Sequence, residues 1–185
     1  EGRYFTKGNL VAETLLFEKD GENLEIPFGT HILLQCENLE DLVIGCEIGS
    51  DGDSVISPAT YHAMAGATVI VNLSALSSGI GKKEKTDSEL KATTDRLICA
   101  YIMANAGAGE STQDIVMSGY NVVFETGEKL CANAPFSYDN VYSEIDVQKL
   151  AMERMRKNTY PYIENNDYIF VNFVVEEEET RSKGM

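Results

Sequence analysis

The chain has 185 residues, of which 43% are hydrophobic and 24% charged, and its formal net charge at pH 7 is -15. This length suits one well-buried domain or a domain fragment, and the composition is that of a globular protein. The acidic balance argues against any partner that is recognised through a basic surface, so we expect neither nucleic acid nor a membrane as a partner. No apolar stretch approaches the roughly 20 residues that span a bilayer.

The positions of the cysteines and histidines argue against disulfide bonds and against a metal site. The four cysteines lie within apolar runs and lack CxxC spacing: Cys36, Cys46, Cys99 and Cys131. We therefore expect reduced thiols in the core of a cytoplasmic protein rather than a disulfide framework. The two histidines, His31 and His62, are far apart and have no cysteine or carboxylate at ligand spacing, so no metal site is expected.

The first predicted elements in chain order are strands. Residues 10–17 and 24–28 are apolar and flank the turn-forming residues 19–22, which predicts a hairpin. A short strand is expected over 32–34. Residues 42–48 form a continuous apolar run that is typical of a buried strand.

Loops and helices alternate with strands in the middle of the chain. A loop rich in glycine, aspartate and serine over 49–57 leads to Pro58, whose fixed φ suits the start of a short helix over 60–65. Residues 68–73 are rich in β-branched side chains and form the clearest strand. Apolar residues at three- and four-residue spacing then predict a helix over 84–105.

The last third of the chain continues the alternation of strands and helices. The predicted elements are a hairpin of residues 116–125 and 129–132, a strand over 142–145, a helix from Asp146 as N-cap to Arg156, and an edge strand over 168–175. The order of strands and helices along the whole chain predicts a layered α/β fold.

Several motifs in fixed order resemble one known family. They are Glu47-Ile48-Gly49-Ser50-Asp51, then Asn72-Leu73-Ser74, then Gly109-Glu110-Ser111-Thr112 ahead of the second hairpin. The glutaminase domain of glutamine-dependent NAD synthetases, which belongs to the nitrilase superfamily, has Glu-Ile-Cys-Glu-Asp, Asn-Leu-Ser and Gly-Glu-Ser-Thr at this spacing. Arg3-Tyr4-Phe5 and the helix from Asp146 are also similar to family segments, so the resemblance covers nearly the whole chain.

The resemblance implies a fold and an activity. The fold is a four-layer αββα sandwich, of which residues 1–175 are the C-terminal portion and residues 176–185 an acidic tail or linker. In this family a cysteine thiolate attacks the glutamine carboxamide, a glutamate acts as base and a lysine stabilises the oxyanion. The ammonia passes to a synthetase domain of the same polypeptide. ATP and Mg are expected only in that domain, so no cofactor is expected in this chain, and a homo-oligomer is expected.

The sequence departs from the family at the nucleophile. Gly49 stands where the cysteine is expected, Ser50 replaces the motif glutamate, and the family's catalytic glutamate and lysine belong to earlier strands. Cys46 lies an odd number of residues from Gly49, so on a strand it points to the opposite face. The former glutamine pocket is predicted to comprise Glu47, Ser50, Asp51, Ser74, Lys82 and Glu110.

Three functional hypotheses follow. The first is a glutaminase domain of a glutamine-dependent NAD synthetase that is inactive because of Gly49. The second is a non-catalytic scaffold or oligomerisation domain of an ammonia-using NAD synthetase, which the Lys85-Thr86-Asp87 stretch also favours because the family usually has arginines there. The third is another nitrilase-like amidase, against which the Gly-Glu-Ser-Thr motif counts.

Overall fold

The computed structural model describes residues 13–161 and 167–176. Its strands are β1 (Glu13–Lys19), β2 (Glu22–Phe28), β3 (Ile32–Cys36), β4 (Val43–Ile48), β5 (Val69–Ser74), β6 (Ala100–Asn105), β7 (Val122–Glu125), β8 (Glu128–Ala132) and β9 (Ile169–Phe173). Its helices are α1 (Pro58–Met64), α2 (Lys82–Leu97) and α3 (Val147–Arg156), with 3-10 turns at Gly49–Asp53 and Ala108–Glu110. The predicted α/β class is confirmed.

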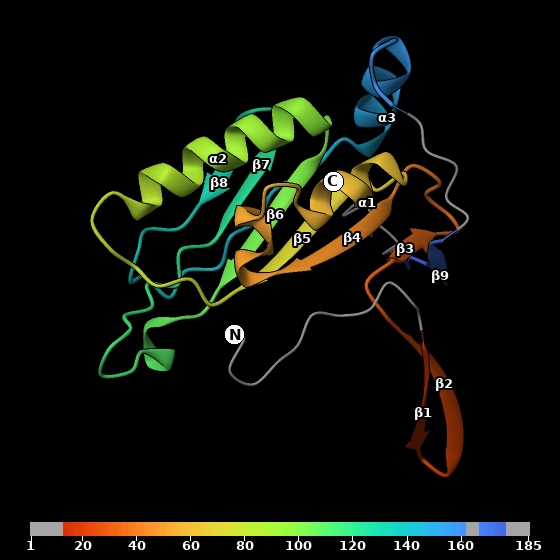
Figure 1. Ribbon diagram of the computed structural model, residues 1–185, viewed down its shortest axis with the longest axis horizontal. Helices are drawn as coiled ribbons and strands as arrows, with labels where there is room; N and C mark the ends of the chain where they lie inside the picture. Colours follow the sequence, from red (N-terminus) through yellow and green to blue (C-terminus); the bar gives the residue numbers. More distant parts are fainter. Residues whose placement is uncertain (1–12, 162–166, 177–185) are drawn as a thin grey trace, which may run out of the picture.

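Seven of the strands form one sheet in the order β8-β7-β6-β5-β4-β3-β9, and β1 and β2 form a separate hairpin that projects from it (Figure 1). The three central strands β4, β5 and β6 are parallel, with α1 and α2 as their connections. The carboxyl ends of these strands therefore meet at one edge of the sheet, where side chains from all three converge.

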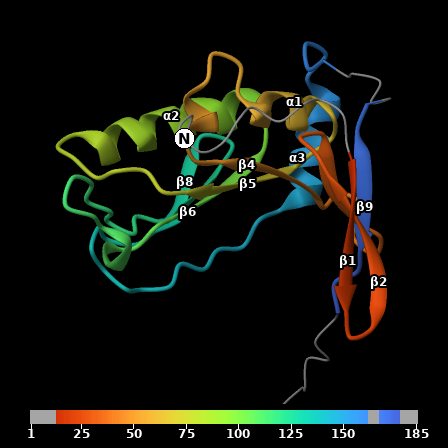
Figure 2. The same ribbon diagram turned by 60° about the horizontal axis from the view of Figure 1, so that its bottom comes forward.

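The two faces of the sheet are covered differently. Figure 2 shows α1 and α2 over one face, where Ala63 and Leu97 join a buried cluster with Ile70. On the other face, Leu150 of α3 belongs to a smaller buried cluster with Val69 and the start of β6. The far ends of β4 and β5 on this second face leave large apolar side chains uncovered, with Ile48 69% and Leu73 60% exposed.

The helix predicted over 84–105 is wrong in its second half. The helix α2 ends at Leu97, Ile98 has a φ of 47°, and residues 100–105 form β6 between two other strands. Because β6 is central and its first residues are buried on both faces, its apolar run carries no period-two alternation. Such a run cannot be distinguished from a helix by pattern alone.

Two further predictions are corrected. Residues 142–145 form no strand but part of the connection from the edge strand β8 to α3, and Tyr142 is 81% exposed. Cys46 is exposed rather than in the core, and Cys131 is only partly buried. The reason at Cys46 is strand alternation, since the neighbouring Glu47 takes the face that α1 covers.

Other predictions are confirmed. The first hairpin is present with its turn at Asp20 and Gly21, Pro58 begins α1, and the Asp146 carboxylate accepts a hydrogen bond from the Lys149 backbone N–H at 2.9 Å. The strand β9 lies at the edge of the sheet. The motif Arg3-Tyr4-Phe5, residues 10–12 of the first predicted strand and residues 177–185 of the acidic tail lie outside the described residues.

His62 attaches α1 to the sheet. Its Nε2 donates to the backbone carbonyl of Cys46 at 3.0 Å, so its Nδ1 accepts from the Tyr168 hydroxyl at 3.0 Å. Gly45 permits this approach, because a Cβ there would lie 2.7 Å from the His62 Cβ. Burial lowers the pKa of His62 below its ordinary value, and the nearby His31 lowers it further.

The neutral His62 should make stability depend on pH. Below about pH 6.5 the unfolded chain takes up a proton that the folded chain accepts only at lower pH, so the free energy of unfolding falls as the pH falls through this window. We expect His62→Gln, which keeps a donor and an acceptor, to lose less stability between pH 7 and pH 5 than the wild type in urea unfolding. Equal losses in the two proteins would contradict this role.

Candidate functional site

A buried polar network joins the ends of β4 and β5 with the start of β6. Glu47 on β4 is 2% exposed, and its Oε1 accepts hydrogen bonds from the Tyr101 hydroxyl and, at 3.3 Å, from Asn72 Nδ2. Its Oε2 accepts from the backbone N–H of Ala59 at 3.0 Å, in the first turn of α1. Burial and the charge of Glu47 hold the pKa of Tyr101 well above its usual range, so this hydroxyl remains a donor.

The same network holds the turn after β4. Asn72 Nδ2 also donates to the backbone carbonyl of Gly49 at 3.1 Å, and Asp51 Oδ2 accepts from the backbone N–H of Ile48 at 3.1 Å. Gly49 has a φ of 56°, in the left-handed region, and a Cβ at this position would meet no atom within 4 Å. A side chain at position 49 therefore has space, at a backbone cost of about 1 kcal/mol.

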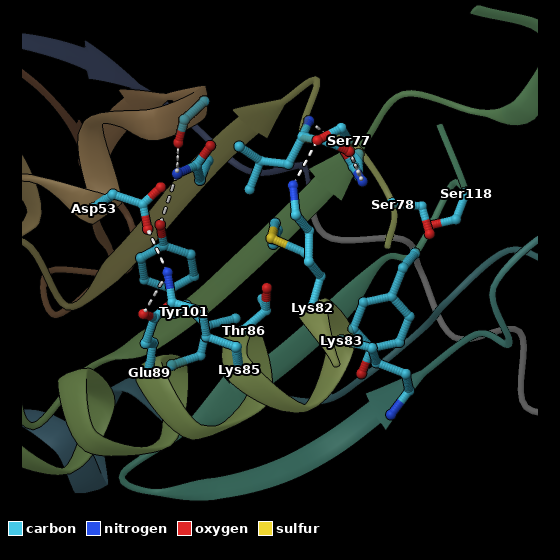
Figure 3. Close-up of a pocket in the computed structure, with 18 of the residues that line it drawn as sticks. Asp53, Ser77, Ser78, Lys82, Lys83, Lys85, Thr86, Glu89, Tyr101 and Ser118 are labelled. Carbon is cyan, nitrogen blue, oxygen red and sulfur yellow. Dashed lines mark hydrogen bonds and ion pairs between the residues drawn. The ribbon is translucent and has the colours of Figure 1, made fainter. Parts of the chain in front are cut away.

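A pocket of about 190 Å³ opens between this network and α2 (Figure 3). Glu47, Gly49, Asn72 and Tyr101 line it from the sheet. The lining from the helix, the preceding loop and the segment before β7 includes Ser77, Ser78, Lys82, Lys83, Lys85 and Ser118. The pocket thus lies where the topology brings the ends of the parallel strands together, which is the common place for a ligand in an open α/β sheet.

The pocket lysines differ in how their charges are balanced. Lys83 Nζ lies 3.0 Å from Asp87 Oδ2, and Lys85 Nζ lies 3.2 Å from Glu89 Oε1. Lys82 Nζ instead donates to the Ser77 hydroxyl at 2.6 Å. Burial raises the pKa of Asp87, but hydrogen bonds from Lys129, Tyr120 and Lys83 outweigh it and leave the pKa below its ordinary value.

The structure brings some predicted site residues together and separates others. Glu47, Gly49 and Lys82 line the pocket. Ser74 is buried behind it, with its hydroxyl donating to Asn72 Oδ1 at 2.6 Å. Three more are exposed and do not line it: Ser50, Asp51 and Glu110. That these residues once bound glutamine stays a prediction.

Sequence reasoning missed two members of the network. In the sequence, Asn72 stands out only as part of the Asn-Leu-Ser motif, because its burial and its hydrogen bonds with Tyr101 and Ser74 arise in the folded sheet. Tyr101 falls within the helix that the sequence predicts over 84–105. On the correct strand, its alternation with Ala100 and Ile102 directs it toward α2 and the pocket.

The described part of the chain shows neither a metal-binding cluster nor a membrane-spanning helix. Residues 13–161 and 167–176 contain no group of three or more histidine, cysteine, aspartate or glutamate side chains placed to hold a metal ion. Within the same residues, no helix has the length and apolarity required to cross a membrane. No cysteine is among the described residues that line the pocket.

The arrangement of sheet and helices places the chain in a structural class. Nit3 of Saccharomyces cerevisiae, a member of branch 10 of the nitrilase superfamily, has a TM-score of 0.54 at 15% sequence identity, over 63% of this chain and 42% of that one. A glutamine-dependent NAD(+) synthetase from Cytophaga hutchinsonii has a TM-score of 0.57 at 26% identity, over 75% of this chain and 21% of that one. The chain therefore has a partial nitrilase-type fold.

Sequence comparison narrows the class to one family. Glutamine-dependent NAD(+) synthetase of Mycobacterium leprae is 34% identical over 140 residues, and that of Mycobacterium tuberculosis is 32% identical over 138 residues. The alignments cover 75% and 74% of this chain but only 21% and 20% of those proteins. No family model matches. The chain is a homologue of the nitrilase-like portion of glutamine-dependent NAD(+) synthetases and spans about a fifth of their length.

The polar network makes a testable contribution to stability. Tyr101→Phe removes a buried donor to Glu47 and an acceptor for Asn72, so we expect the free energy of unfolding to fall by roughly 1–3 kcal/mol. Tyr138→Phe, at a side chain that is 89% exposed, is the matched control and should change it by less than about 0.5 kcal/mol. Both values are measured by urea unfolding, and equal effects would exclude a structural role for the Tyr101 hydroxyl.

Proposed function

We propose that the chain is the nitrilase-like part of a glutamine-dependent NAD synthetase and that it does not hydrolyse glutamine. The observation that carries the proposal is that Gly49 lines the pocket. In the motif over residues 47–51 this glycine stands where the family resemblance leads us to expect the nucleophilic cysteine. Amide hydrolysis of this type needs a thiolate that forms a thioester with the substrate carbonyl carbon. Glycine supplies no such group, so the pocket can hold a ligand but cannot start this chemistry.

Among the described residues, three side chains near Gly49 are candidates to replace the missing thiol, and each is poorly placed for that role. Cys46 is exposed and, one residue before Glu47 on β4, points away from the pocket face. Ser50 is exposed and lies outside the pocket lining. Ser77 lines the pocket, but its partner Lys82 is an exposed ammonium that donates to the hydroxyl, and a protonated amine cannot act as its base.

The proposed function also requires a synthetase domain and further copies of the protein as partners. A synthetase domain of the same polypeptide would use ATP and Mg to make NAD, and the whole protein would be a homo-oligomer. A second candidate is a scaffold or oligomerisation domain for a synthetase that uses free ammonia. The exposed Ile48 and Leu73 on the second face of the sheet favour it, because apolar residues of this size normally pack against another surface.

Glutamine hydrolysis by the chain itself is the first test. We expect the 185-residue protein to release ammonia from glutamine no faster than the buffer blank, because no cysteine is among the described residues that line the pocket. Ammonia is measured by a coupled enzymatic assay. Release above the blank that is saturable in glutamine would overturn the proposal.

The full-length protein distinguishes the two candidates. We expect NAD synthesis with ammonium salts and none with glutamine. Gly49→Cys tests the position directly, and Gly49→Ala is the matched control because it imposes the same backbone strain without a thiol. Glutamine use restored by cysteine and not by alanine would support the inactive glutaminase, whereas failure of both would support the scaffold. Glutamine use by the wild type would refute the assignment of Gly49.

A further inference from the structure

The hairpin of β1 and β2 has one apolar and one polar face. The two strands pair in a continuous register, in which Leu15 lies opposite Ile26. Side chains that face each other across an antiparallel pair share one face of the sheet, and every second residue of each strand joins them. The apolar face of the hairpin therefore carries Leu15, Phe17, Leu24, Ile26 and Phe28. The polar face carries Thr14, Leu16, Glu18, Asn23, Glu25 and Pro27.

The apolar face is exposed in the described part of the chain. The strands β1 and β2 form a separate two-stranded sheet that projects from the seven-stranded sheet (Figure 1). The five side chains of the apolar face are each between 40% and 58% exposed. An isolated hairpin is at best marginally stable in water, and a contiguous apolar surface normally marks a contact with another surface. The apolar face is therefore a docking surface.

The edges of the hairpin are less suited to a partner than its apolar face. Proline in a sheet is found where its missing N–H would point away from the ladder, so Pro27 leaves the outer edge of β2 without one donor. The charged side chains of Glu18 and Glu25 also disfavour the addition of a strand at an edge. A partner should therefore pack on the apolar face.

Charges at the two ends of the apolar face indicate what this partner is. Glu13 lies on this face at the base of β1, and Lys19 lies on it at the tip, next to the turn. Neither forms an ion pair within residues 13–161 and 167–176, although Glu22 is the cross-strand neighbour of Lys19. A second hairpin of the same sequence, turned end for end, would place its Lys19 opposite Glu13 and its Glu13 opposite Lys19.

We infer that the apolar faces of two hairpins, one from each of two copies of the chain, pack on each other end for end across a two-fold axis. Two sheets that pack in this way lie about 10 Å apart. Leu15 then lies opposite Phe17 of the second copy, and Leu24 lies opposite its Ile26. The inference rests on the homo-oligomer of the proposed function, not on the loss of glutamine hydrolysis.

The end-for-end orientation also follows from the shape of the chain. The hairpin projects from the seven-stranded sheet, which lies at the base of the hairpin (Figure 2). Two hairpins that pack end for end hold the two large sheets at opposite ends of the contact. Two hairpins with their tips on the same side would bring both large sheets to one end, where they would compete for space.

The first test is sedimentation velocity of the 185-residue protein over a range of concentrations. A standard interface has roughly 20–30 residues a side, and this one has fewer, so we expect a weak, reversible dimer. Phe17→Glu should weaken it by at least about a hundredfold, because it buries two unpaired charges. Leu16→Glu is the matched control, since Leu16 is 75% exposed but lies on the polar face, and it should leave the dimer unchanged.

Exchange of charges tests the orientation of the hairpins. Lys19→Glu and Glu13→Lys should each weaken the dimer by about fivefold, because like charges then meet at both ends. The double variant should dimerise as the wild type does. The two residues lie six positions apart on β1, or about 20 Å, which exceeds the screening length of about 8 Å at physiological salt. Rescue by the double variant can therefore arise only between two copies.

Three results would overturn the inference. They are a wild type that stays monomeric up to about 1 mM, equal effects of Phe17→Glu and Leu16→Glu, and a double variant as weak as the single ones. A dimer that withstands Phe17→Glu would also overturn it, but would keep the homo-oligomer of the proposed function and assign it to another surface. The glutamine assay is unaffected by any of these outcomes, so the two proposals fail separately.

Discussion

The carboxylate of Glu47 is the constraint on which the rest of the site depends. A buried carboxylate costs several kcal/mol unless its oxygens are hydrogen-bonded. Here the donors are Tyr101, Asn72 and the backbone of Ala59, so one side chain joins β4, β5, β6 and the start of α1. No lysine or arginine of the described chain pairs with it. The positive end of the α1 dipole and the hydrogen bonds therefore carry the compensation.

The geometry of the pocket follows from this network. Asn72, while bonded to Glu47, also holds the carbonyl of Gly49 and so keeps the turn after β4 in a left-handed conformation with open space before it. If Gly49 stands at the nucleophile position, as we propose, the turn that would carry a nucleophile is formed without one. The opposite wall, from α2 and its preceding loop, is cationic and rich in hydroxyls at one end. The pocket of about 190 Å³ therefore has polar walls on both sides without a side chain at position 49.

Local patterns in the sequence predicted much of the fold. Turn chemistry at Asp20 and Gly21, proline at position 58 and the N-cap Asp146 each act within a few residues, and their elements were found where expected. Strand alternation likewise separated Cys46 from Gly49. The end of α2 was not predicted, because it depends on a distant residue: Arg154 of α3 donates to the carbonyls of Ile98 at 2.9 Å and Leu97 at 3.3 Å. No pattern within residues 84–105 contains that information.

By itself, the sequence determined the α/β class and the family resemblance, because these depend on short motifs in fixed order. It also predicted Gly49 as the nucleophile position, which stays a prediction. Only the tertiary structure decided which side chains share the pocket. Glu47 and Asn72 are paired on adjacent parallel strands, and Tyr101, which is paired with Ile70 on the next strand, reaches both with its hydroxyl. Ser50 and Glu110, equally prominent in the motifs, are exposed. The physical reason is that packing sets the burial of side chains and the hydrogen bonds between distant segments. Local sequence patterns carry no information about this packing.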